Sequence, residues 1–169
     1  MISWFKKSKH NNDLYNTLLN LSRNIFFYKN INLKDSFETR IYLMFFHFSI
    51  ILIIYKKKGE IFNQVSYDNL FHSIENNLRE LGLGDVSVNK KMKDLNKILY
   101  DILLKLDEKK NNNNEFKLSK TLIIKYFSSL ESNNGSNFSQ IEDYFTNFVN
   151  FCFELPLDNM LKEIKNFKY

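Results

Sequence analysis

The chain has 169 residues, of which 44% are hydrophobic and 25% are charged, and it carries a formal net charge of +5 at pH 7. A globular chain of this length buries roughly two thirds of its unfolded surface, so the class of small domains that depend on disulfides or a metal is excluded. The positive charge is only weak evidence for nucleic-acid binding, because a chain without alanine, with three arginines and with abundant lysine, asparagine, isoleucine and phenylalanine has the composition expected from an AT-rich genome.

Residues 1–12, MISWFKKSKHNN, are expected to form a flexible basic N-terminus. This stretch has neither the apolar run and cleavage site of a secretory signal nor the arginine-rich and serine-rich character of a transit peptide. Its tryptophan, phenylalanine and lysines suit contact with an anionic membrane, which we keep as an alternative for this segment. Residues 13–169 are predicted to be one helical domain with flexible loops at 109–117 and 131–137.

Apolar residues recur at helical spacing almost throughout this domain. A first helix is predicted over 13–28, where one face is apolar: Leu14, Leu18, Leu21 and Ile25. A second helix is predicted to begin at Asp35, which has the form of a capping box with Glu38, and to end at the lysines before Gly59.

The second helix is apolar from Ile41 to Tyr55 and is interrupted only by His47 and Ser49. These fifteen residues span roughly 22 Å, which is less than the ~30 Å hydrocarbon core of a bilayer. We therefore interpret the helix as the buried centre of the fold, with a membrane-embedded anchor as the alternative. His47 is interpreted as a hydrogen-bonded core residue, not as a catalyst.

Further helices are predicted over 66–81, 88–106 and 116–130, and from Ser139, which forms a second capping box with Glu142. Pro156 is expected to end that last helix and to open a short terminal one. The predicted fold is therefore all-α: a single-domain bundle of about six helices around a buried central apolar helix.

The turn between 66–81 and 88–106 contains two of the four glycines, in the stretch LGLGDVSVNKKMK. Gly82 is expected to end one helix with left-handed backbone angles, and Gly84 to allow a tight turn. Asp85 or Ser87 is expected to cap the next helix. The lysines that follow are expected to point mostly outward: Lys90, Lys91, Lys93 and Lys97.

The sequence contains no recognisable pattern for catalysis or metal binding. His10, His47 and His72 are far apart, and LGLGD lacks the preceding strand and the lysine of a phosphate-binding loop. The single cysteine, Cys152, lies in the apolar run NFVNFCFEL, so we expect a buried thiol in a reducing compartment. We expect no catalytic residue, no metal and no cofactor, and the protein is not predicted to be an enzyme.

The corner resembles the signature of the ubiquinol-cytochrome c chaperone family, in which a helix ending in S-L-R-E-x-G is followed by V-G-D-L-S-V and a basic patch. The matching residues are Leu78, Arg79, Glu80, Gly82, Gly84, Asp85, Ser87, Val88, Lys91 and Met92, with Tyr100 similar to a later tyrosine. The segments LYNTLLNLSRNIFFYKN, DSFETRIYLMFFHFSIILIIYKKKG and PLDNML resemble further parts of the family in the same order. The residues matched there are expected to be structural: Arg23, Tyr28, Arg40, His47 and Pro156.

The resemblance implies an assembly factor for the cytochrome bc1 complex that holds newly made, nascent or apo cytochrome b until haem and partner subunits are added. It implies peripheral contact with the inner membrane, from the cytoplasm of a bacterium or from the mitochondrial matrix. The ribosome exit region and a small partner protein are further expected partners, and specific DNA is not.

Such a chaperone requires an apolar groove for a client helix, with a basic rim. We expect the corner to be a client-binding or partner-binding surface as well as a turn. The residues expected to form this surface are Arg79, Glu80, Gly82, Gly84, Asp85, Ser87, Lys90, Lys91 and Lys93.

The alternative function is a basic helical module that binds nucleic acid or the ribosome without a membrane client. It would use the lysines of the fourth helix on phosphates and would show a steep salt dependence. The absence of patches that combine aromatic residues with arginine counts against it.

Overall fold

The computed structural model describes residues 13–108, 116–132 and 135–169, and all of the regular structure in these ranges is helical. The α-helices are α1 (Asp13–Ser22), α2 (Ile25–Lys29), α3 (Phe37–Lys57), α4 (Gln64–Glu80), α5 (Asp85–Glu108), α6 (Lys120–Tyr126), α7 (Ser136–Glu154) and α8 (Leu157–Glu163). Short 3-10 helices follow at Ser128–Leu130 and Ile164–Asn166. The predicted all-α class is confirmed. The expected flexibility of 1–12, and of most of 109–117 and part of 131–137, falls outside the described residues.

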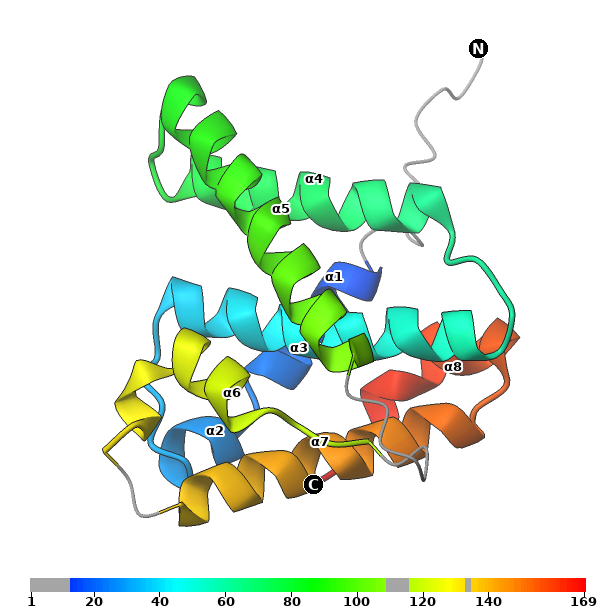
Figure 1. The fold of residues 1–169 in the computed structure, drawn as a ribbon. Helices are drawn as coiled ribbons and strands as arrows, with labels where there is room; N and C mark the ends of the chain where they lie inside the picture. The colour runs from blue at the N-terminus through cyan, green and yellow to red at the C-terminus, as the bar shows by residue number, and fades with distance from the viewer. Residues whose placement is uncertain (1–12, 109–115, 133–134) are drawn as a thin grey trace.

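Helix α3 crosses the middle of the fold, with α4 and α5 above it and α7 below it in Figure 1. It contacts α1, α5 and α7, and every residue from Leu43 to Ile51 is buried. Within the described ranges it is also the one helix long and apolar enough to cross a membrane, but 61% of that apolar window is buried inside the fold. The predicted central helix is therefore confirmed.

The expectation that α3 is too short to cross a membrane is wrong. The helix has 21 residues and spans about 31 Å, so its length alone does not separate it from a membrane span. Burial on all sides by other helices is what identifies α3 as the core helix.

The predicted first helix over 13–28 is in fact two helices. The backbone breaks at Asn24, whose side-chain oxygen accepts a hydrogen bond from the Phe26 N–H at 3.0 Å and so caps α2. The Tyr28 hydroxyl donates to the Ser22 carbonyl at 2.6 Å and holds the two helices together. Apolar spacing continues across the break because both helices face the same core.

Two predicted capping boxes are wrong. Helix α3 is capped by Ser36, whose Oγ accepts from the Thr39 N–H at 3.2 Å, while the carboxylate of Asp35 pairs with Arg40 at 2.9 Å. Helix α7 starts three residues before Ser139, after Gly135, which has a φ of +76°. A serine or aspartate followed three residues later by a glutamate occurs at more positions than actual helix starts. Packing decides where each helix begins.

The helix predicted over 116–130 is shorter than expected. Ser119 caps α6 by accepting from the Leu122 N–H at 3.4 Å, and the helix ends at Tyr126 before a 3-10 turn. Pro156 lies where it was predicted, at the start of α8, with a φ of −59° that suits a helix start.

A polar pair lies inside the aromatic core between α3 and α7. The Nδ1 atom of His47 is 2.6 Å from the Leu43 carbonyl, which can only accept, so Nδ1 carries the proton. The Nε2 atom is therefore the acceptor for the Tyr144 hydroxyl, at 2.8 Å. Burial lowers the pKa of His47 to about 4, so the neutral ring is the stable form. The prediction of a hydrogen-bonded core histidine is confirmed.

Cys152 is fully buried, as predicted. Burial raises the pKa of its thiol to about 12, so little thiolate forms near neutral pH.

Candidate functional site

Helices α4 and α5 form a hairpin whose corner projects beyond the rest of the fold (Figure 1). Helix α4 ends because Gly82 has a φ of +92°, and the Leu83 N–H returns to the Leu78 carbonyl at 3.3 Å. The left-handed conformation predicted for Gly82 is confirmed. Gly84 has no positive φ, and its carbonyl accepts from the Val88 N–H at 2.9 Å.

The cap predicted for the helix after the corner is wrong. Helix α5 already begins at Asp85, so Gly84 occupies the capping position and Ser87 lies inside the first turn, exposed. The Asp85 carboxylate instead turns back to the preceding helix, where it accepts from Nη1 of Arg79.

Arg79 joins the two helices at the corner. Its other nitrogen, Nη2, is 3.0 Å from Oε1 of Glu75, one turn earlier on α4. Both carboxylates hold the guanidinium in its charged form and raise the pKa of Arg79. Two of the predicted site residues, Arg79 and Asp85, therefore meet in one ion-pair cluster that links the two helices across the corner.

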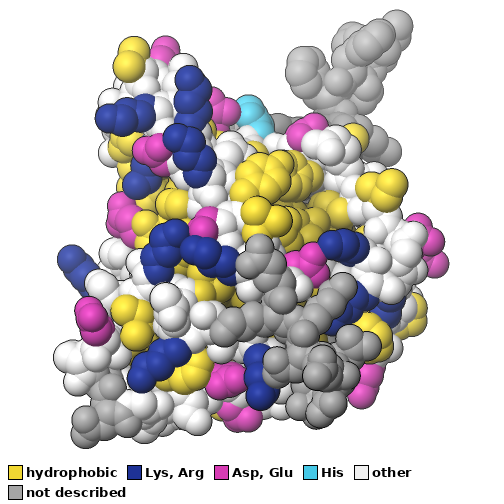
Figure 2. All heavy atoms as spheres, viewed as in Figure 1, with side chains coloured by type: hydrophobic (Ala, Val, Ile, Leu, Met, Phe, Trp, Pro, Cys, Tyr) yellow, Lys and Arg dark blue, Asp and Glu magenta, His cyan; other side chains and the backbone are white. Residues whose placement is uncertain are grey.

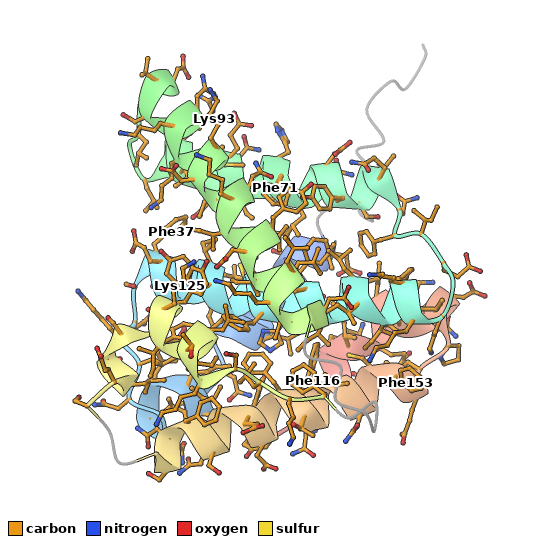
Figure 3. The ribbon with its side chains drawn as sticks, in the orientation of Figure 1. Phe37, Phe71, Lys93, Phe116, Lys125 and Phe153 are labelled. Carbon is orange, nitrogen blue, oxygen red and sulfur yellow. The ribbon has the colours of Figure 1, made fainter. Side chains whose placement is uncertain are left out.

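The predicted basic residues do not all face the same way. Lys90 and Lys93 are exposed, and Figure 3 shows Lys93 near the outer end of α5. Lys91 is half-buried, with Nζ 3.7 Å from Oε1 of Glu38 at the start of α3. Figure 2 shows lysine and arginine side chains over the first turns of α5, interspersed with carboxylates. The rim is thus mixed in charge, and Lys91 also connects α5 to the central helix.

The corner also exposes aliphatic side chains. Leu81 is 57% exposed and Val86 is 84% exposed. Leu81 is exposed because it follows the last residue of α4, where the chain leaves the helix. Glu80 is exposed beside it.

An apolar surface, here called the aromatic patch, lies where α4 and α5 diverge from the corner over α3. Its members are Phe62, Tyr67, Tyr100 and Leu104. Figure 2 shows continuous apolar atoms in this position, and Figure 3 places Phe71 in the angle between the two helices. Tyr100 and Leu104, one turn apart on α5, are 55% and 58% exposed. Exposed apolar side chains that lie together in this way are typical of interaction surfaces.

Aromatic stacking on α3 fixes the α4 side of the aromatic patch. The ring centroid of Phe48 lies 5.3 Å from that of Phe62 and 5.8 Å from that of Tyr67. Tyr67 in turn stacks on Phe71, with ring centroids 4.9 Å apart. Burial, and then the neighbouring Tyr100 hydroxyl, raise the pKa of Tyr67. The two tyrosines are therefore close, although they lie on different helices. Helical periodicity places Tyr67 and Phe71 on one face, but it could not show that Tyr100 lies opposite.

Several charged residues matched by resemblance lie close enough to Tyr15 of α1 to affect its hydroxyl. The charges of Arg23, Glu80 and Arg40 all act on the hydroxyl of Tyr15, whose pKa is raised chiefly by burial. Burial is also the main cause that raises the pKa of Tyr28, and the charges of Arg23 and Arg40 oppose this rise. The fold thus gathers residues from α1, α2, α3 and α4 that are far apart in the sequence.

The described residues include no group of three or more His, Cys, Asp or Glu side chains placed to hold a metal ion. His47, Cys152 and Pro156 lie in the core or at a helix start, away from the corner.

Residues 29–165 match the sequence model of the ubiquinol-cytochrome C chaperone family. The chain belongs to this family. Its match to the ubiquinol-cytochrome c chaperones includes α3, the corner and the aromatic patch, whereas Arg23 and Tyr28 precede the matched range. The chain matches no curated protein and no solved structure.

Proposed function

We propose that this protein is an assembly chaperone of the cytochrome bc1 complex and that its client is newly synthesised cytochrome b. The observation that carries the proposal is the family match over residues 29–165. The function requires no catalytic group: the protein acts by holding a client until haem and partner subunits are added.

The aromatic patch supports this function by its chemistry. Cytochrome b is a membrane protein, and before it is assembled its apolar helices must be kept from aggregating. A helix presents side chains at spacings of three and four residues, and such a row can lie along Tyr67, Tyr100 and Leu104. Tyr67 stacks on Phe71 and packs against Phe48 of α3, which restricts the α4 side of the surface, so little conformational entropy is lost when a client binds.

The corner is the second part of the proposed surface. Lys90 and Lys93 are exposed one and two turns after Val86 on α5, and Leu81 is exposed at the end of α4, so apolar and cationic groups lie together near the tip of the hairpin. This combination suits a client that emerges beside anionic lipid headgroups or ribosomal RNA. The proposed location is therefore peripheral to the inner membrane, on the cytoplasmic side in a bacterium or on the matrix side in a mitochondrion, near the ribosome exit.

The test is purification of the tagged protein from its own cells in mild detergent, followed by mass spectrometry. We expect enrichment of cytochrome b without the other subunits of the mature complex. A Tyr100→Ser/Leu104→Ser variant should lose this enrichment, because both side chains are exposed and their removal does not open the core. Phe153→Ser is the matched control, since Phe153 is 51% exposed on α7, away from the aromatic patch (Figure 3).

Equal loss of cytochrome b in the control variant would remove the aromatic patch from the proposal. Recovery of ribosomes or nucleic acid without cytochrome b would favour the basic-module function instead.

A further inference from the structure

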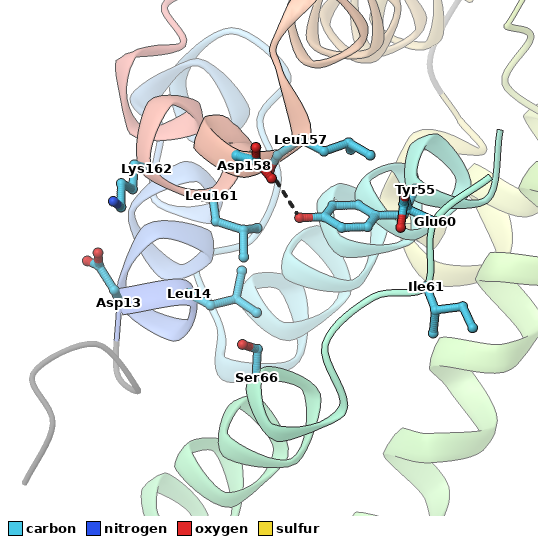
Figure 4. Close-up of a pocket in the computed structure, with 10 residues that line it drawn as sticks. All are labelled: Asp13, Leu14, Tyr55, Glu60, Ile61, Ser66, Leu157, Asp158, Leu161 and Lys162. Carbon is cyan, nitrogen blue, oxygen red and sulfur yellow. Dashed lines mark hydrogen bonds between the residues drawn. The ribbon is translucent and has the colours of Figure 1, made fainter. Parts of the chain in front are cut away.

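A pocket of about 470 Å³ lies between α1, the end of α3, the α3–α4 loop, the start of α4 and α8. Figure 4 shows Leu14, Leu161 and the Tyr55 ring directed into it from three separate helices. The Tyr55 hydroxyl donates to the Leu157 carbonyl at 3.4 Å, which links α3 to α8 along one wall. The inner wall is therefore apolar and braced by a hydrogen bond.

The rim of this pocket is acidic. Asp13, Glu60 and Asp158 line it, and Lys162 is the single basic residue among the lining side chains. Within the ranges that the structure describes, none of these three carboxylates takes part in an ion pair, although carboxylates elsewhere in the fold do. Burial raises the pKa of the Tyr55 hydroxyl on the inner wall, and the negative charge of Asp158 raises it further. The pocket thus combines an apolar wall with three carboxylates that form no ion pair within the described residues.

The apolar surface continues outside the mouth of the pocket. Ile61, which also lines it, is 93% exposed, more than any other large hydrophobic side chain in the described part of the chain. A ligand that covers Ile61 as well as the inner wall must extend beyond the pocket, which favours a polypeptide segment over a small cation.

We propose that this pocket binds a cationic amphipathic segment of a partner polypeptide. An apolar side chain of the segment packs against Leu14, Tyr55 and Leu161, and its lysine or arginine side chains pair with the carboxylates at the rim. Charge complementarity selects this occupant, because an acidic or purely apolar segment would leave the carboxylates desolvated without partners. The inference does not rest on the chaperone function, because none of these residues belongs to the aromatic patch or to the corner.

The test is fluorescence anisotropy of the full chain with a labelled peptide of about 14 residues, roughly 21 Å as a helix, built from leucine and lysine at helical spacing. A second probe replaces every lysine with glutamate. We expect the lysine peptide to bind, the glutamate peptide not to bind, and the affinity to fall as salt screens the rim. A Glu60→Gln/Asp158→Asn variant should bind the lysine peptide roughly fivefold more weakly, and Ile61→Ser should also weaken it.

The matched control is Glu131→Gln/Glu142→Gln, which removes the same number of charges at a distance from the pocket. Glu142 lines a second, polar hollow with Asp143 and Tyr169, so the control also tests acidity without an apolar wall. Equal weakening in this control, or no weakening in the pocket variants, would overturn the proposal. Binding that is seen only after residues 1–12 are deleted would overturn it too, since the chain's own basic N-terminus would then compete for the pocket.

Discussion

The Nε2 atom of His47 lies 2.8 Å from the Tyr144 hydroxyl, and this buried hydrogen bond ties the central helix α3 to α7. The rings around it are packed closely: the ring centroids of Tyr144 and Phe27 are 4.6 Å apart, and those of His47 and Phe148 are 4.8 Å apart. A charged imidazolium has no anionic partner in such a setting, so the stability of the fold depends on His47 staying neutral.

This arrangement predicts a loss of stability in mild acid. The ordinary pKa of 6.5 applies to His47 in the unfolded chain, and burial lowers it to about 4 in the folded one. The contribution of neutral His47 to the free energy of unfolding is complete above pH 6.5. It is lost as the pH falls towards 4, because the unfolded chain binds the proton first. It amounts to ~3 kcal/mol.

Thermal unfolding followed by circular dichroism between pH 7.5 and 4 tests this. His47→Gln should flatten the slope of Tm against pH in that window, whatever its effect on Tm at neutral pH. His72→Gln is the control, because it makes the same replacement at an exposed position outside the core. An unchanged slope in His47→Gln would show that other groups cause the acid loss.

The two glycines of the corner are predicted to differ in their tolerance of substitution. Gly82→Ala places a Cβ at a φ of +92° and should lower the free energy of unfolding by about 1–2 kcal/mol. Gly84→Ala should cost less, since its φ is not positive and an added Cβ meets nothing within 4 Å, which leaves only the preference of the N-cap for glycine over alanine. Chemical denaturation of both variants measures the difference, and equal costs would contradict the backbone argument.

The corner is predicted to contribute to client binding beyond its role as a turn. Asp85→Ala and Lys91→Ala should weaken cytochrome b binding while helicity and Tm stay nearly unchanged, because each ion pair has an exposed carboxylate and such pairs contribute little to stability. Asp143→Ala and Lys168→Ala provide the same chemical changes on exposed residues away from the corner. If binding is intact and stability alone falls, the corner is merely structural.

Cys152 is predicted to resist alkylation in the folded protein. Burial both blocks access and raises its thiol pKa to about 12, so the reactive thiolate is scarce. Labelling with iodoacetamide at pH 8, followed by mass spectrometry, should be slow in buffer and fast in denaturant. Rapid labelling without denaturant would place the thiol at the surface.

The sequence by itself determined the all-helical class, the buried central helix and the roles of His47, Cys152 and Gly82. Apolar spacing of three and four residues is a local property, and a helix apolar on all sides must be buried or lie in a membrane. The residues of the corner, contiguous in the chain, also carried the family resemblance that the match over 29–165 confirms.

Tertiary structure decided which of several caps is used, how the corner is braced and where apolar surface stays open. Ser36 and Gly84, rather than Asp35 and Asp85, occupy the capping positions of their helices, and the two aspartates form ion pairs with arginines several residues away. Tyr67 and Tyr100 form one patch only because α4 and α5 diverge over α3, and the acidic pocket collects residues from five segments. Such sites depend on the angles between packed helices, which no local spacing in the sequence encodes.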